Sequence, residues 1–318
     1  MHEVKKKNFE KNESSVRDSK VNHEKEELNT ETSKTVKTLP TTVEQNNNDT
    51  AEDEILFLIA NKKPVPHHLL VDYLMEKYIF RTILDTDEIL FYENGAYRFN
   101  AEKKIIMKEL QLAFKQIINE NVIREVCSHI RNETRVERTK FDKYAHVINV
   151  KNGLFNLELF KLEPHDSDYL SIIQIPVNYD PNAKCPKNEK TFHEWTDPLN
   201  VQVLIEFAGY CLYRKHPIKK LIILCGVNDT GKSKFIEFLR IFLGKNNTWS
   251  ASLKHLTQGN FSRGFLYGKL LNAPGEISQR YMNDDDFIKR ATGGDSIHTD
   301  KKFKDEFDFD SFSNGGLS

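Results

Sequence analysis

The residues of this chain best suited to chemistry are the run GVNDTGKS, which we call the glycine loop (residues 226–233). It fits the pattern G-x-x-x-x-G-K-[ST], in which the glycines let successive backbone N–H groups turn inward onto phosphate groups. Lys232 would reach the β and γ phosphate oxygens of ATP, and the Ser233 hydroxyl would ligate Mg²⁺. The candidate ATP-binding residues are Gly226, Val227, Asn228, Asp229, Thr230, Gly231, Lys232 and Ser233.

The segments on either side of the glycine loop are those that a phosphate-binding loop requires. Residues 221–224 (LIIL) form a continuous apolar run, typical of a buried parallel strand. After the loop, one apolar stripe at helical spacing predicts a helix that ends at Gly244, a residue suited to a C-cap; the stripe consists of Phe235, Phe238, Leu239 and Phe242. The pattern predicts a strand, a phosphate loop and a helix in succession.

Hydrolysis of ATP also needs a carboxylate on a neighbouring strand, which holds the Mg²⁺ shell or polarises the attacking water. The segment YGKLLNAPGEIS supplies a candidate, because Leu270 and Leu271 begin a short apolar strand and Glu276 follows its end. The expected catalytic residues are therefore Lys232 and Glu276, and the expected Mg²⁺ ligands are Ser233 and Glu276.

A third feature is the block FIKRATGGDSIHTDKKFKDEFDF, which predicts a hairpin after the turn at residues 293–295. Cations on a projecting hairpin suit contacts with a nucleic-acid backbone. The candidate DNA-binding residues are Lys289, His298, Lys301 and Lys302. Acidic residues are interleaved with them, so a solvated hairpin of mixed charge remains the alternative.

Composition narrows the class of protein. The 318 residues hold 46 Lys and Arg against 47 Asp and Glu, so no global positive field attracts nucleic acid, and DNA binding would require a local patch. The four cysteines contain no Cys-x-x-Cys pair, and Cys185 and His193 lack partners for a metal site. No apolar run approaches the roughly 18 residues of a membrane span. We expect a cytoplasmic protein without membrane association.

Changes in composition along the chain predict four parts. Residues 1–52 hold almost no large apolar side chains and predict a disordered tail. Residues 53–143 predict a helical module around a hairpin at Asn94-Gly95. Residues 144–198 predict a β-rich part, with a hairpin around residues 151–153 and the strand-like segment SIIQIPVNYD, that ends near the run DPNAKCPKNEK. Residues 199–318 form the segment with the glycine loop, preceded by a helix at about residues 200–213. The fold class is α/β.

Arginines at the end of the helical module leave its role open. Helices around a small hairpin resemble a winged-helix DNA reader, and local positive charge follows from Arg131, Arg135, Arg138 and Lys140. A structural module with a solvated basic face is the favoured alternative.

The order of these features resembles the superfamily III helicases in the primase-helicases of phages, plasmids and large DNA viruses. The resemblance runs from Glu88 to Phe309 and includes ILFYENGAYRF, VINVKNGLFNLELF, the glycine loop, the Glu276 strand and the hairpin block. It implies an AAA+-like ATPase core that uses ATP and Mg²⁺, forms a ring, usually a homo-hexamer, and moves along single-stranded DNA during replication. A primase or replication initiator is the implied protein partner.

Two departures from the family pattern matter. Asp229 and Thr230 stand where the family often has Gly and Asn. The family also continues past FDFDSF into an apolar strand with a polar sensor, and then a segment with an arginine finger, whereas this sequence reads SFSNGGLS. Asn314 is not preceded by an apolar strand, so the expected core is incomplete, with an unpaired sheet edge. We expect a truncated form with weak or absent unwinding activity.

Two other classes of function remain alternatives. The first is a non-catalytic DNA- or partner-binding protein derived from such a helicase. The second is another phosphate-loop enzyme, such as a small-molecule kinase, for which the sequence shows neither a substrate lid nor an acceptor base.

Overall fold

The chain divides into two units, Met1–Asn47 and Asn48–Ser318. The computed structural model describes residues 50–215, 217–218, 220–258, 260–274, 289, 293, 296–301, 304–311 and 314–317, all in the second unit. Nearly all of the predicted N-terminal tail lies outside these residues. Ordered helix begins at Ala51, where Thr50 and Asp53 form a reciprocal capping box.

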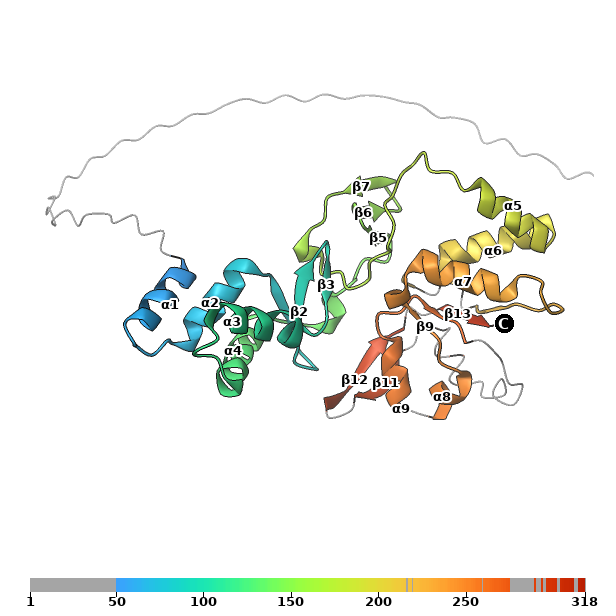
Figure 1. The fold of residues 1–318 in the computed structure, drawn as a ribbon. Coiled ribbons are helices and arrows are strands. Elements are labelled where there is room, and N and C mark those ends of the chain that lie inside the picture. Colours follow the sequence, from blue (N-terminus) through green and yellow to red (C-terminus); the bar gives the residue numbers. More distant parts are fainter. Residues whose placement is uncertain are drawn as a thin grey trace, which may run out of the picture. The chain divides into compact units, whose positions relative to one another are not determined.

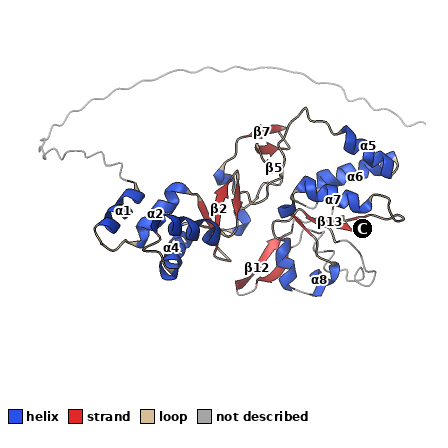
Figure 2. Ribbon diagram, viewed as in Figure 1, coloured by secondary structure: helices blue, strands red, loops and turns tan. Residues whose placement is uncertain are grey.

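Helices cover a small sheet in the N-terminal part of the second unit (Figures 1 and 2). The helices are α1 (Ala51–Ala60), α2 (His67–Lys77), α3 (Met107–Phe114), which extends a π-helical turn (Glu102–Ile106), and α4 (Glu120–Glu133). The sheet has the order β3-β2-β1-β4, with β1 (Phe80–Ile83), β2 (Glu88–Glu93), β3 (Ala96–Arg98) and β4 (Arg135–Val136).

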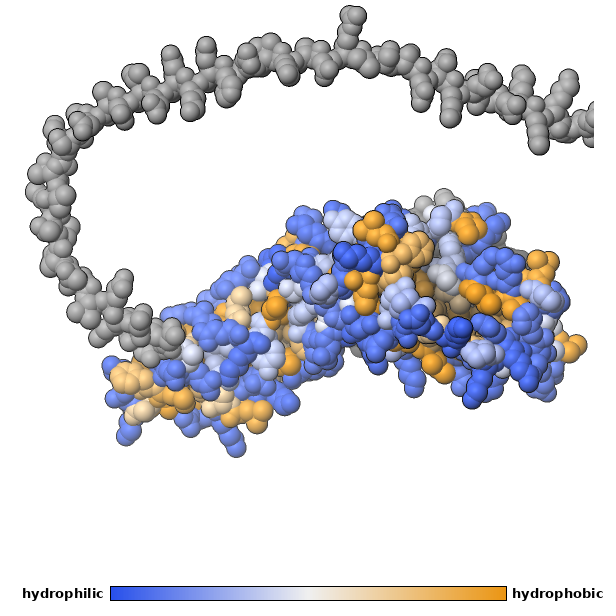
Figure 3. Space-filling model, turned by 90° about the horizontal axis from the view of Figure 1, so that it is seen from above, coloured by the Kyte–Doolittle hydropathy of each residue, from blue (hydrophilic) through white to orange (hydrophobic). Residues whose placement is uncertain are grey.

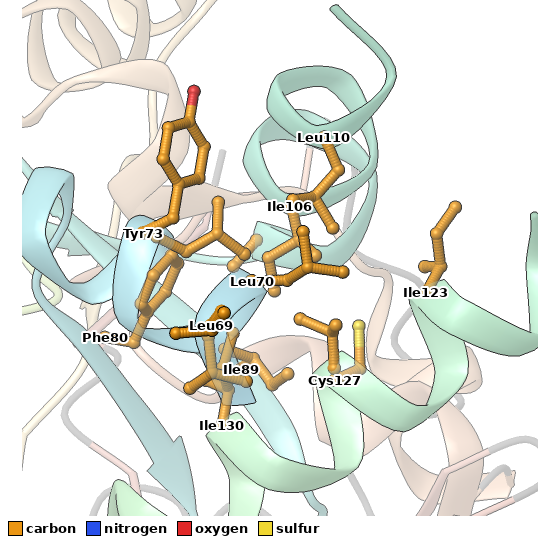
Figure 4. Packing of buried hydrophobic residues seen from close by; sticks show 14 of the residues in the cluster. Leu69, Leu70, Tyr73, Phe80, Ile89, Ile106, Leu110, Ile123, Cys127 and Ile130 are labelled. Atoms are coloured by element: carbon orange, nitrogen blue, oxygen red, sulfur yellow. The ribbon is translucent and has the colours of Figure 1, made fainter. Parts of the chain in front are cut away.

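Apolar side chains of the helices and strands form the core of this part. Side chains from α2, α3 and α4 meet those of β1 and β2 in one buried cluster (Figure 4). The predicted hairpin at Asn94-Gly95 joins β2 to β3, and both residues have positive φ, at 50° and 84°. This is the conformation that makes Asn-Gly a strong hairpin signal.

An antiparallel three-stranded sheet follows, with β5 (Val147–Val150), β6 (Gly153–Asn156) and β7 (Lys161–Glu163). The predicted hairpin around residues 151–153 is confirmed. The next apolar segment, SIIQIPVNYD, was expected to be strand-like, but it forms only an isolated bridge between Val150 and Ile175. Pro176 follows Ile175 and lacks the N–H donor that a longer ladder needs.

The C-terminal part combines helices with a parallel sheet. Its helices are α5 (Pro186–Trp195), α6 (Pro198–Tyr210), α7 (Lys232–Leu243), α8 (Leu253–Gln258) and α9 (Asn260–Arg263). Its strands are β8 (Ile222–Ile223), β9 (Thr248–Trp249), β10 (Leu271–Asn272), β11 (Ser296–Lys301), β12 (Lys304–Asp310) and β13 (Asn314–Leu317). Short 3₁₀ turns occur at Arg138–Lys140, Ser167–Tyr169, Lys245–Asn247 and Gly264–Leu266.

The parallel sheet corrects one expectation from the sequence. Its order is β8-β13-β10-β9, so β13 lies between the strand before the glycine loop and the strand that precedes Glu276. The expected gap in the sheet is therefore filled by residues 314–317. The strand escaped notice because NGGL contains two glycines and one large apolar residue, although its backbone groups pair on both sides.

A second hydrophobic cluster links the parts of the chain on either side of the predicted boundary near residue 198. It joins Ile148, Val150, Ile173 and Ile175 with side chains of α5, α6, α7 and β10. Helices α6 and α7 lie beside each other on one side of the parallel sheet (Figure 1). On the face drawn in Figure 3, hydrophobic side chains form small separate groups among hydrophilic ones. In the part of the chain that the structure describes, no helix has the length and apolar character of a transmembrane segment.

Candidate functional site

The glycine loop connects β8 to α7 and presents the start of that helix. Gly231 is the N-cap of α7, with φ 86° and ψ −3°, and no side chain caps the first turn. Asp229 also has positive φ, at 62°. Left-handed residues within a turn direct successive N–H groups to one side, and uncapped N–H groups at a helix N-terminus favour an anion. The backbone geometry therefore suits phosphate.

Lys232 lies over the glycine loop. Its Nζ donates to the carbonyl oxygens of Gly226 and Val227 at 3.0 and 2.6 Å, and it lies 3.4 Å from Oγ1 of Thr230. The ammonium thus sits on the loop's own backbone, where it adds positive charge to the N-terminus of α7. Lys234, two residues further along α7, instead pairs with Glu237 at 2.9 Å.

Both glycines of the motif lie close to neighbouring side chains. A Cβ at Gly231 would lie 2.5 Å from the indole of Trp195, and its positive φ also disfavours any side chain. A Cβ at Gly226 would lie 2.9 Å from Oγ1 of Thr230, whose hydroxyl donates to the Val227 carbonyl at 2.9 Å. The geometry of a phosphate cradle is thus strict at Gly231, whereas a side chain at Gly226 would displace the Thr230 hydroxyl.

A cavity of about 610 Å³ opens beside the glycine loop. Five of the predicted ATP-binding residues line it, namely Gly226, Val227, Thr230, Gly231 and Lys232. Asn228, Asp229 and Ser233 do not line it, and Ser233 is exposed at the start of α7. The structure therefore brings most of the predicted loop residues onto one cavity.

The rest of the cavity lining includes residues that the sequence interpretation did not assign to the nucleotide site. They belong to the end of α5, the first turns of α6 and β8: Trp195, Thr196, Asn200, Val203, Leu204, Ile222, Ile223 and Leu224. The only sequence signal was the Asp197-Pro198 helix start, which predicts where α6 begins but not that it lies beside the loop. β8 was expected to be buried, but it is an edge strand and Ile223 is 41% exposed.

The acidic partner Glu276 lies outside the described residues, so its role as catalytic residue and Mg²⁺ ligand stays a prediction. The strand expected before it is present as β10, whose Leu271 and Asn272 are buried. The side-chain oxygen of Asn272 accepts from the Ala251 N–H at 2.9 Å, which ties β10 to the segment after β9. In a parallel sheet, ligand groups gather beyond the carboxyl ends of the strands, and the glycine loop follows β8 at that edge.

The predicted hairpin of the DNA-binding block is present as β11 and β12, which pair antiparallel. Ile297 and Phe309 point into a small core, each 4% exposed. His298 Nδ1 lies 2.9 Å from the Asp308 carboxylate across the hairpin. This pair favours the mixed-charge alternative at His298. Lys301 lies at the end of β11, Lys302 lies outside the described residues, and Lys289 is exposed.

The arginines at the end of the helical module do not form a free basic patch. Arg131 pairs with Glu102, Arg135 with Asp87 at 3.3 Å, and Arg138 with both oxygens of Asp85 at 2.6 and 2.7 Å. Arg138 is buried, whereas Lys140 is exposed. Because three of the four positive charges are paired with carboxylates, the structural interpretation of this module is favoured over a DNA reader.

Two family models match separate parts of the chain. Residues 67–198 match the model described as "D5 N terminal like". Residues 224–315, which include the whole glycine loop, match a "Family of unknown function (DUF5906)". No curated protein matches the chain.

Solved structures of one protein share the fold. The apo structure of the NrS-1 C terminal region has a TM-score of 0.52 and 14% identity, and the match covers 78% of this chain and 56% of that one. The A form apo structure of the same region has a TM-score of 0.52 and 13% identity, and the match covers 78% of this chain and 55% of that one. The chain thus spans about half the length of these structures. At this level of identity, the likeness to these structures shows a shared fold over most of this chain.

Proposed function

We propose that this chain is the nucleotide-binding part of a superfamily III helicase, with an AAA+-like core, that acts in phage-, plasmid- or virus-type DNA replication. The observation that carries the proposal is the glycine loop between β8 and α7, with Lys232 turned onto the loop and the helix N-terminus uncapped. The parallel order β8-β13-β10-β9 supports it, because the strand before Glu276 lies in the same sheet as β8.

The proposed ligands are ATP and Mg²⁺. The backbone N–H groups of the glycine loop and the Lys232 ammonium would hold the phosphates, and Ser233 and Glu276 would hold the metal ion. Bound Mg²⁺ would neutralise charge that develops on the phosphates during hydrolysis. Single-stranded DNA is the proposed polymer, a homo-hexameric ring the proposed assembly of the whole protein, and a primase or replication initiator the proposed partner.

The test compares ATP binding to three forms of the chain by calorimetry in the presence of Mg²⁺: the unmodified chain, Lys232→Ala and Lys234→Ala. A hydrogen bond that involves a charged group contributes about 1.5–3 kcal/mol. Lys232→Ala loses such bonds to phosphate, so its affinity for ATP should fall by about tenfold to a hundredfold. Lys234→Ala is the matched control, since its side chain pairs with Glu237 on the exposed face of α7. Equal affinities for ATP in all three would refute the proposed site.

A second measurement separates a helicase-type ATPase from a non-catalytic relative. ATP turnover is followed with and without single-stranded DNA at low salt. Stimulation by DNA that Lys232→Ala abolishes supports the helicase class. DNA binding that falls with salt and does not change with ATP supports the non-catalytic alternative.

A further inference from the structure

The cavity beside the glycine loop is lined by two kinds of group. One kind is the loop backbone with Lys232, which is the only charged side chain among the described residues that line the cavity. The other kind is aromatic and aliphatic, from Trp195, Val203 and Leu204. A polyphosphate is matched by the loop and Lys232 alone, so the aromatic and aliphatic lining suits a different chemical group.

Trp195 is held in a fixed position beside the glycine loop. Its indole lies against Gly231, so that a Cβ there would come within 2.5 Å of the ring. Phe192, one turn earlier on α5, contacts the indole with ring centroids 5.5 Å apart. A flat aromatic surface beside a phosphate loop is suited to stack on a planar heterocycle.

Polar groups next to the indole can give the cavity hydrogen-bonding preference. Asp197 caps α6 by accepting from the N–H groups of Leu199 and Asn200 at 3.0 and 3.2 Å. The Asn200 amide nitrogen donates to the same carboxylate at 2.5 Å. The amide is thereby oriented, and its carbonyl oxygen is left to accept from a ligand. Thr196 adds a hydroxyl at the same rim.

From this arrangement we propose that the cavity wall formed by Trp195, Asn200, Val203 and Leu204 binds the nucleobase of the nucleotide whose phosphates the glycine loop holds. The base would stack against the indole and pack on the aliphatic side chains of α6, and the Asn200 carbonyl would accept from an exocyclic amino group. Apolar walls with a few oriented polar groups are typical of small-molecule sites, and 610 Å³ lies within their range of about 300–1,000 Å³.

This inference rests on the proposed function, since it extends the same nucleotide site. Its test therefore uses two ligands, Mg²⁺-ATP and inorganic tripolyphosphate with Mg²⁺, which share the phosphates and differ in the nucleoside. The variant is Val203→Phe, which adds a phenyl ring to the aliphatic lining of the cavity. Ile205→Phe is the matched control, because Ile205 lies two residues further along α6, does not line the cavity, and is 48% exposed against 46% for Val203.

Val203→Phe should weaken ATP binding about tenfold, an effect of about 1.4 kcal/mol, and leave tripolyphosphate binding unchanged. Ile205→Phe should change neither. Equal affinity of the unmodified chain for the two ligands, or unchanged ATP affinity in Val203→Phe, would overturn the base pocket and leave the phosphate site intact. Failure of the unmodified chain to bind either ligand would overturn the proposed function and this inference with it.

A fluorescence measurement makes the test independent of the folding of Val203→Phe. The chain has two tryptophans, Trp195 and Trp249, so Trp249→Phe isolates the emission of Trp195. Stacking predicts that ATP quenches this emission and that tripolyphosphate at saturation does not. Identical spectra with the two saturating ligands would contradict contact between the base and Trp195.

Discussion

The four cysteine thiols of this chain differ in burial, and this difference provides a probe of the nucleotide site. Cys127 and Cys211 are buried, whereas Cys185 and Cys225 are exposed. Burial raises the pKa of the Cys127 thiol to about 11, and it raises the pKa of Cys211 well above its ordinary value. Since the thiolate is the reactive form, both buried thiols should be protonated and inert at pH 8.

We predict that an alkylating agent at pH 8 modifies Cys185 and Cys225 in the folded protein well before Cys127 and Cys211. At that pH, a pKa of about 11 leaves only about one Cys127 thiol in a thousand ionised. Because Cys225 lines the cavity, ATP should slow its modification. Cys185 is the N-cap of α5, at the opposite end of that helix from Trp195, and should react at the same rate with and without ATP. Timed labelling followed by peptide mass mapping gives the four rates. Unchanged labelling of Cys225 at saturating ATP would count against the cavity as the nucleotide site.

At the scale of elements, strand β13 controls the integrity of the parallel sheet. It pairs with β10 through Asn314 and Gly315, and with β8 through Gly316 and Leu317. Without it, β8 and β10 would each expose a row of backbone donors and acceptors, and β8 would have no partner among the described strands. The glycine loop begins directly after β8, so the position of the loop depends on β13.

We therefore predict that Gly316→Pro destabilises the chain and lowers ATP affinity together. Proline removes a ladder N–H from a strand that has a partner on each side, and the loss of a backbone hydrogen bond costs about 0.5–1.5 kcal/mol in addition to the misfit of the proline ring. Gly316→Ala keeps the N–H and should stay within about 1 kcal/mol of the unmodified chain. Urea unfolding and ATP titration of the same samples provide both quantities. Equal losses of stability and ATP affinity in Gly316→Pro and Gly316→Ala would show that loss of the backbone hydrogen bond is not their cause.

Secondary structure with a strong local signal was predictable from the sequence. The helix after the glycine loop, the Asn94-Gly95 hairpin and the β11–β12 hairpin were all predicted, because spacing and turn residues determine them locally. β13 was missed because its identity as a strand comes from two distant neighbours, and NGGL carries little local preference. Within the site, the motif indicated the glycine loop, but the Trp195 wall depends on how α5 and α6 pack.

The burial of a charged side chain was also not predictable from the sequence. Arg214 begins the basic run RKHPIKK (residues 214–220), which follows the predicted helix at residues 200–213, yet Arg214 is only 2% exposed. Its guanidinium donates to the carbonyl oxygens of Asp142 and Tyr144 and to the Tyr169 hydroxyl, at 3.3, 2.6 and 2.8 Å. A sequence pattern cannot distinguish a solvated cation from one that satisfies distant carbonyl groups, because the partners lie far away along the chain.

At the scale of the whole second unit, the side chain of Tyr267 contacts residues from both of the segments that match family models. Its ring lies 4.4 Å from the guanidinium carbon of Arg138 and makes edge contacts with Phe99 and Phe309, at 6.5 and 5.8 Å between centroids. Phe99 and Arg138 belong to the D5 N terminal like match, and Phe309 belongs to β12 of the other match. The phenol ring therefore links the candidate DNA hairpin to the N-terminal part.

We predict that Tyr267→Ala destabilises the unit by up to about 3 kcal/mol, the lower end of the cost of deleting a fully buried aromatic side chain, because Tyr267 is partly buried. Tyr267→Phe keeps the ring, its edge contacts and its contact with Arg138, so it should cost no more than about 1.5 kcal/mol for the hydroxyl.

Calorimetric melting should show one cooperative transition for the unmodified unit and for Tyr267→Phe. In Tyr267→Ala, Arg138 keeps its pair with Asp85, so the N-terminal core should persist and its transition should separate from that of the sheet around β10. A single transition in Tyr267→Ala, lowered no further than in Tyr267→Phe, would mean that the hydrophobic cluster around Ile148 and Leu271 holds the two parts together without the ring.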